Sequence, residues 1–208
     1  MSQDKLAAHL QVDRYGSFQL THAVRPALDV PVVPREGFRV DIYHDPRNGL
    51  RVPVLAASVS GERLFDTFLA LLEPLEEIVD VVLETSHEHS GAGHRDLIRE
   101  HIDRPVLESH FCDYEDLLVN DGCTGVAVIG LDAPIEVQFD EHKLLIVYAH
   151  DLDPFKSILR RYGLRPDHQM KLITEGEHLH TTQRHFRDQF EQLCYRLGVG
   201  EALEHVNW

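Results

Sequence analysis

The sequence predicts an α+β protein built from an internal tandem duplication. Three observations lead to this prediction. The motif E-x-x-H-x-H-x-x-x-x-H occurs twice, at residues 84–94 and 175–185; an apolar helical pattern precedes each copy; and a β-hairpin pattern precedes each helical pattern. Chance is a poor explanation for the repeated motif, because the chain has only 15 histidines in 208 residues and three of them coincide at one offset.

The first half carries the elements in a clear order. Two runs with strand-like composition, residues 38–43 and 50–58, flank the turn segment His-Asp-Pro-Arg-Asn-Gly and predict a hairpin. A helix is predicted next, since its apolar residues recur at i, i+3, i+4 and i+7. A strand at 78–83 and a second helix at about 91–102 complete this half. The apolar residues of the first of these helices are Phe65, Phe68, Leu69 and Leu72.

The second half repeats this order. Strands are predicted at 135–139, 143–148 and 170–173, and the last helix at about 182–197. The intervening helix shows the same apolar spacing as its counterpart, at Phe155, Ile158, Leu159 and Tyr162. With helix-like stretches near 4–10 and 114–119, each half becomes α-β-β-β-α-β-α with a mixed sheet. We therefore expect one compact unit with pseudo-two-fold symmetry, divided into residues 1–108 and 109–208.

The composition is that of an acidic globular protein. Hydrophobic residues make up 43% and charged residues 26%, and the formal net charge is -15. An excess of acidic residues disfavours nucleic acid and anionic membrane surfaces as partners. No apolar run reaches the length of a transmembrane helix, and the first residues do not resemble a signal peptide. Three dispersed cysteines argue against a disulfide framework, and together these features predict a cytoplasmic protein.

The repeated motif supplies the candidate site. Ser90 and Thr181 are predicted helix N-caps, which would place the histidines at 89 and 94, and at 180 and 185, at positions whose side chains meet. Imidazoles held together beside a carboxylate suit Zn²⁺ or another divalent metal. The predicted ligands are Glu84, His87, His89 and His94 in the first half, and Glu175, His178, His180 and His185 in the second.

Three interpretations of this motif stay open. The preferred function is a divalent-metal protein, most simply a zinc protein, and as an enzyme it would be a metal-dependent hydrolase. The histidines and glutamates could instead be packing and capping residues of a non-catalytic interaction or regulatory protein. Proton chemistry or pH sensing without a metal is the third. Isolated histidines in polar contexts, His142 among them, are predicted to be surface residues and not ligands.

Overall fold

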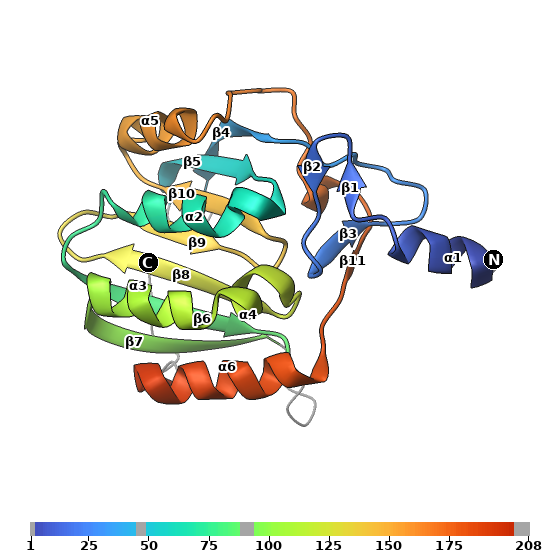
Figure 1. Cartoon of the computed structure of the whole chain (residues 1–208). Coiled ribbons are helices and arrows are strands. Elements are labelled where there is room, and N and C mark those ends of the chain that lie inside the picture. The colour runs from blue at the N-terminus through green and yellow to red at the C-terminus, as the bar shows by residue number, and fades with distance from the viewer. Residues whose placement is uncertain (1–2, 45–48, 88–93, 202–208) are drawn as a thin grey trace.

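A computed structural model describes residues 3–44, 49–87 and 94–201, and its centre is an eight-stranded antiparallel sheet (Figure 1). Every pair of neighbouring strands in this sheet is antiparallel. In spatial order the strands are β12 (Gly200–Glu201), β7 (Arg95–Asp103), β6 (Ile78–Thr85), β8 (Thr124–Gly130), β9 (Glu136–Phe139), β10 (Leu144–Tyr148), β5 (Arg51–Ser58) and β4 (Gly37–His44).

Five helices pack on one side of the sheet and share a single apolar core with it (Figure 1). Alternate strand residues face these helices, so that buried pairs such as Leu83 and Val126 lie opposite each other on neighbouring strands. Phe68 lies at the centre, with its ring 5.6 Å from that of Phe111 and 5.2 Å from that of Phe139. The helices are α2 (Gly61–Leu72), α3 (Arg104–Asp113), α4 (Glu115–Asn120), α5 (Asp153–Arg161) and α6 (Arg184–Leu197).

The opposite face of the sheet is covered only in part. Met170 and Leu172, from the segment after α5, pack on Ala56 of β5 and Leu144 of β10. Farther along this face a cavity of about 380 Å³ lies beside the edge-to-face pair of Tyr43 and Tyr148. This side therefore presents both polar and apolar groups to solvent.

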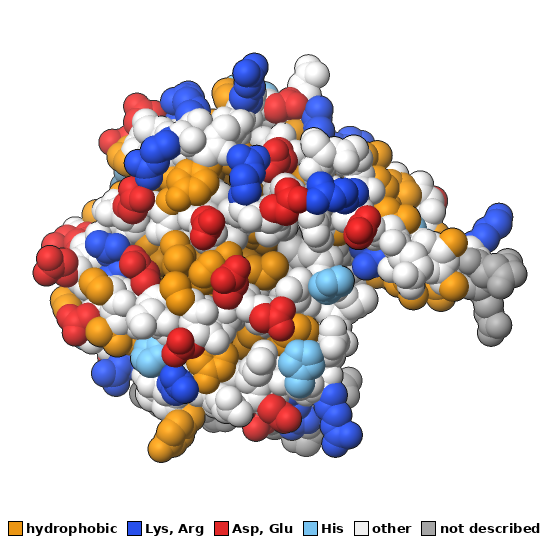
Figure 2. Space-filling model, in the orientation of Figure 1, with side chains coloured by type: hydrophobic (Ala, Val, Ile, Leu, Met, Phe, Trp, Pro, Cys, Tyr) orange, Lys and Arg blue, Asp and Glu red, His pale blue; other side chains and the backbone are white. Residues whose placement is uncertain are grey.

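The N-terminal residues form an arm beside the main body, on the right in Figure 1. It contains α1 (Gln3–Leu10), a short pair β1 (Arg14–Tyr15) and β2 (Phe18–Gln19), and β3 (Val24–Pro26). The strand β11 (His178–His180), which follows the 3₁₀ turn η1 (Ile173–Glu175), pairs antiparallel with β3. In Figure 2 pale blue histidine side chains lie near the corner where the arm meets the body, while acidic and basic side chains are scattered over the helical face.

The predicted α+β class is confirmed, but the mixed sheet is wrong, since the main sheet is antiparallel throughout. The two hairpins, the helices at α1, α2, α4, α5 and α6, and the strand β6 are where the sequence places them. Strands from both predicted halves join the one sheet, and the division at residue 108 stays a prediction. No helix among the described residues is long and apolar enough to cross a membrane.

The tandem duplication is also wrong, because the element order of the two halves differs after the shared hairpin and helix. Residues 170–173 lead into η1 and form no strand. Residues 95–103 form strand β7, where the second half has helix α6. Among the described residues, the order of elements therefore gives no evidence of pseudo-two-fold symmetry.

A β-bulge explains why β7 resembles a helix in sequence. The register with β6 jumps between Val79 and Val81, which adds one residue to β7. His101 takes a left-handed φ of 55° at this point, and its amide donates to Asp80 Oδ1. Leu97 and Ile102, five residues apart, consequently both face the core. This spacing breaks the alternation expected of a strand.

Candidate metal centre

The strand β11 brings two histidines to one side of the chain. Its register aligns His178 with Pro26 and His180 with Val24, and Leu179 lies between them. Because side chains alternate along a strand, the two imidazoles project from the same face. In this copy of the motif, the H-x-H spacing therefore brings the two histidines together through strand geometry and not through a helix N-terminus.

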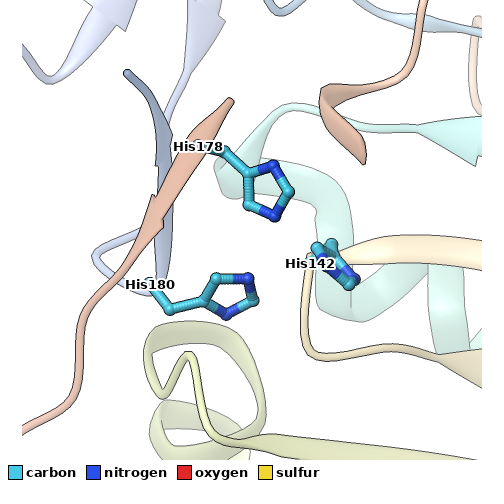
Figure 3. A group of neighbouring side chains, drawn as sticks. All are labelled: His142, His178 and His180. Carbon is cyan, nitrogen blue, oxygen red and sulfur yellow. The ribbon is translucent and has the colours of Figure 1, made fainter. Parts of the chain in front are cut away.

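The third histidine comes from the tight turn between β9 and β10. In this turn the Asp140 carboxylate accepts a hydrogen bond from the amide of Leu144, and Lys143 takes a left-handed φ of 61°. The turn directs His142 toward β11, which is distant in sequence. Three imidazoles from two separate segments thus meet beside the N-terminal arm (Figure 3).

The three rings surround a common space (Figure 3). Their centroids are 5.0 Å apart for His142 and His178, 4.8 Å for His142 and His180, and 5.1 Å for His178 and His180. One ligand atom from each ring lies within 4.8 Å of the other two. Tetrahedral zinc, with Zn–N distances of about 2.0–2.1 Å, places its nitrogens about 3.4 Å apart, so modest side-chain rotation closes the site.

Hydrogen bonding fixes the same tautomer in all three rings. Nδ1 of His178 contacts the carbonyl oxygen of Gly176 at 2.8 Å, Nδ1 of His180 contacts the carbonyl oxygen of Gly122 at 2.7 Å, and Nδ1 of His142 contacts Asp140 Oδ2 at 3.1 Å. Carbonyl and carboxylate oxygens only accept hydrogen bonds, so each Nδ1 carries the hydrogen. Each neutral ring therefore keeps its Nε2 lone pair available for a metal, as metal-binding histidines do.

Electrostatics distinguish the three histidines. The hydrogen bond that His142 donates to Asp140 raises the pKa of His142, whereas partial desolvation of the ring lowers the pKa of His180. The carboxylate of Glu141 acts on both rings and favours their charged forms. An acidic group beside three imidazoles favours any cation there, including a divalent metal.

Solvent can reach the cluster from one side. His142 and His178 are half-buried, and His180 is exposed. If these three side chains held a zinc ion, the reachable surface would leave room for water as a fourth ligand, as in catalytic zinc sites.

A second group of potential ligands consists of His87, Asp121 and Cys123. Asp121 and Cys123 flank Gly122, whose carbonyl accepts the hydrogen bond from His180. Nε2 of His87 contacts Asp121 Oδ2 at 2.8 Å, and the Thr124 hydroxyl donates to the same oxygen. Burial opposes ionisation of Asp121, but these hydrogen bonds outweigh it and hold the pKa of the carboxyl below its usual value. The nearby hydroxyl of Thr182 acts in the same direction.

A close approach at Gly122 holds the turn around this glycine in place. A Cβ atom there would lie 2.5 Å from the carbonyl oxygen of Ala23 and 2.8 Å from that of Thr181, so only glycine fits. The Gly122 amide donates to Thr181, and its carbonyl accepts from His180. The turn is thereby attached to β11 and aligns the two groups side by side.

The first copy of the motif is dispersed. Glu84 lies on the open face of the sheet and is not in either group, His87 belongs to the second group, and His89 lies outside the described residues. His94 is exposed, with Nε2 3.4 Å from Glu141 Oε1. The structure thus joins no two described residues of this copy in one candidate site.

The second copy contributes only its two central histidines. Glu175 points elsewhere: its carboxylate accepts from Arg39, at 2.9 Å, and from the amide of Leu172. His185 lies in α6 with its ring against Phe186. The described groups of potential ligands include neither residue.

The start of α6 differs from the prediction, and this explains why His180 and His185 do not meet. Gln183, and not Thr181, is the N-cap of α6, and His180 belongs to β11. His180 and His185 therefore do not occupy positions that meet across a helix start. The corresponding cap Ser90 lies outside the described residues.

Glu84 provides a pH-dependent test of the open face. Burial and the neighbouring carboxylates of Asp96 and Asp140 raise its pKa from 4.5 to about 7. Since the folded chain holds this proton to a higher pH than the unfolded chain, stability falls as pH rises from about 4.5 to 7. We expect Glu84→Gln to stabilise the protein by about 1–2 kcal/mol at pH 8, discounted for partial solvation, and by little at pH 4. Urea unfolding at both pH values measures this, and equal gains would contradict it.

No protein-family model, curated protein sequence or solved structure matches this chain. The site is consequently the basis for any functional conclusion. What the described residues show are two groups of histidine, cysteine and aspartate side chains that could hold a metal ion.

Proposed function

We propose that this protein binds a divalent metal ion through Nε2 of His142, His178 and His180. The observation that carries the proposal is the common orientation: each Nδ1 is held by an oxygen acceptor, so in each ring Nε2 is the nitrogen that is left to bind a metal. Packing alone would not require three adjacent imidazoles to be oriented in the same way.

Zinc is the metal that this ligand set suits best. Imidazole nitrogen is a borderline ligand that favours Zn²⁺, Cu²⁺ or Ni²⁺, whereas Mg²⁺ and Ca²⁺ require oxygen ligands. Neutral imidazoles would leave a bound zinc its full charge, which makes a zinc-bound water more acidic.

Metal-assisted hydrolysis is the reaction class that we propose for the site. When bound, the metal would supply a water that can lose its proton near neutral pH. Glu141, beside His142 and His180, is positioned as the candidate general base or as an additional acidic ligand. Asp140 orients His142 through the hydrogen bond to Nδ1.

The decisive experiment follows the imidazole nitrogens directly. Metal-free protein without a histidine tag is labelled with ¹⁵N and titrated with Zn²⁺ in an NMR experiment that detects ring nitrogens. We expect Nε2 of His142, His178 and His180 to shift while Nδ1 stays protonated, and Mg²⁺ to have no effect. Binding no tighter than millimolar, or shifts confined to other histidines, would refute the proposal. The non-catalytic interaction protein with structural histidines would then be the better interpretation.

Asp140→Asn tests the hydrogen bond that orients His142. The amide keeps the shape of the side chain but removes its charge, so we expect zinc affinity to fall about 10–100-fold. Competition with a chromophoric chelator measures this in a Cys123→Ser background, which removes the thiol of the second group. The exposed Asp151→Asn is the matched control and should leave affinity unchanged.

A further inference from the structure

We infer that His87, Asp121 and Cys123 form a second, buried metal site, independent of the three-histidine site. One ligand atom from each of these side chains lies within 4.8 Å of the other two. The set combines a thiol, an imidazole and a carboxylate, the three ligand types that Zn²⁺ takes in proteins. His87 is 8% exposed and Asp121 is fully buried, so the site is closed where the first is open.

An unsatisfied buried oxygen supplies the second observation. Asp121 Oδ2 accepts from His87 and Thr124, but Oδ1 has no hydrogen-bond partner of normal geometry among the described residues, even though Thr182 lies near. A buried carboxylate oxygen that lacks a well-placed donor loses its hydration without full compensation. A cation bound between this carboxylate and the other two ligands would satisfy it.

The backbone holds the ligands in place without help from an ion. The amide of His87 donates to the Thr85 hydroxyl, the amide of Asp121 donates to the carbonyl of Leu117, and the amide of Ser86 donates to the carbonyl of Cys123. The ligands thus follow the ends of β6 and α4 and precede the start of β8. In the metal-free chain, the proton between His87 and Asp121 occupies the place that a cation would take.

Binding of a single divalent ion changes the protonation of two ligands. The Cys123 thiol would release its proton to solvent and form one sulfur–metal bond. The hydrogen on Nε2 of His87 would move through solvent to Nδ1 of the same ring, so that Nε2 forms one nitrogen–metal bond, and the Asp121 carboxylate would form one oxygen–metal bond without releasing a proton. Lys143 is buried nearby, where its ammonium group donates to the carbonyl of Thr124. Its positive charge would repel a bound cation, so binding relies on the two negative charges of the Asp121 carboxylate and the Cys123 thiolate to offset that repulsion.

Cobalt titration tests the site apart from the three-histidine site. A His142→Ala/His178→Ala background removes two ligands of the first site and keeps the hydrogen bond from His180 to the Gly122 carbonyl that supports the second. Metal-free protein of this background, titrated with Co²⁺, should develop a sulfur-to-cobalt charge-transfer absorption that saturates at one equivalent. Adding Cys123→Ser should abolish the absorption, whereas Cys194→Ser, at the other half-buried cysteine, should preserve it.

A thiol-reactivity measurement keeps the inference testable without any variant. In native protein, stoichiometric Zn²⁺ should slow alkylation of Cys123 at least about 10-fold, as expected of a coordinated thiolate, and leave the exposed Cys112 unaffected. No sulfur band in the background variant, a band that survives Cys123→Ser, or unchanged alkylation would each overturn the second site. The imidazole titration reports on the first site alone, so the two proposals fail separately.

Discussion

Zinc binding at the three-histidine site should fall at least about 100-fold in His178→Ala, because loss of a direct ligand exceeds the 10–100-fold cost of losing a supporting group. The variant is made in a Cys123→Ser background, so that calorimetry detects only the three-histidine site. The parent should show a rise in melting temperature with Zn²⁺, and the variant should not. Retention of parental affinity would show that His178 is not a ligand.

His185→Ala is the matched control for this prediction. Both residues are histidines of the same sequence motif, but His185 lies against Phe186 in α6 and takes no part in the cluster. We expect its substitution to leave zinc affinity within about twofold of the parent, a difference of roughly 0.4 kcal/mol. A large loss of zinc affinity in His185→Ala would support the ligand set predicted from the sequence motif and contradict the three-histidine site.

Removing Phe68 should cause the largest loss of stability. Its side chain is fully buried between α2, α3 and the sheet, and its ring contacts those of Phe111 and Phe139. Phe68→Ala removes apolar surface that is buried on folding, and it also leaves a cavity. We therefore expect the free energy of unfolding to fall by about 3–5 kcal/mol. Urea unfolding of the metal-free protein measures the change.

Tyr195→Ala is the corresponding control for aromatic deletion. Tyr195 lies on α6 with 88% of its surface exposed. Its substitution should change the free energy of unfolding by less than about 0.5 kcal/mol. If both aromatic variants lost similar stability, the core would not be organised around Phe68.

The sequence predicts elements well where local pattern and tertiary packing agree. The apolar face of Phe65, Phe68 and Leu72 is helical in α2, and the hairpins form where turn residues separate strand-like runs. The prediction from sequence fails at β7, where a bulge brings Leu97 and Ile102 to one face of a strand. Pairing with the neighbouring strands determines the secondary structure of that segment, and a local sequence pattern cannot predict this pairing.

The candidate site was predictable only in part for a similar reason. The H-x-H spacing identifies His178 and His180, and alternation along a strand is a simpler explanation for that spacing than a helix cap. His142 could not be found by motif, since it lies 36 residues before His178 in sequence. One local signal did exist: in the turn Asp140-Glu141-His142 a carboxylate lies close enough to accept a hydrogen bond from the imidazole, as the supporting groups of metal-binding histidines do.

The pairing of β11 with β3 sets a limit on when the candidate metal centre can form during synthesis. Val24 and Pro26 leave the ribosome before their partners His180 and His178, which follow more than 150 residues later. Contacts so distant along the chain form slowly, because a long loop must close before any of them stabilises the product. Until then Val24–Pro26 is an unpaired edge, open to pairing with other chains. An ion that requires His178 and His180 in their β11 positions would therefore bind only to chains in which β3 and β11 have already paired, and its uptake would report that this pairing is complete.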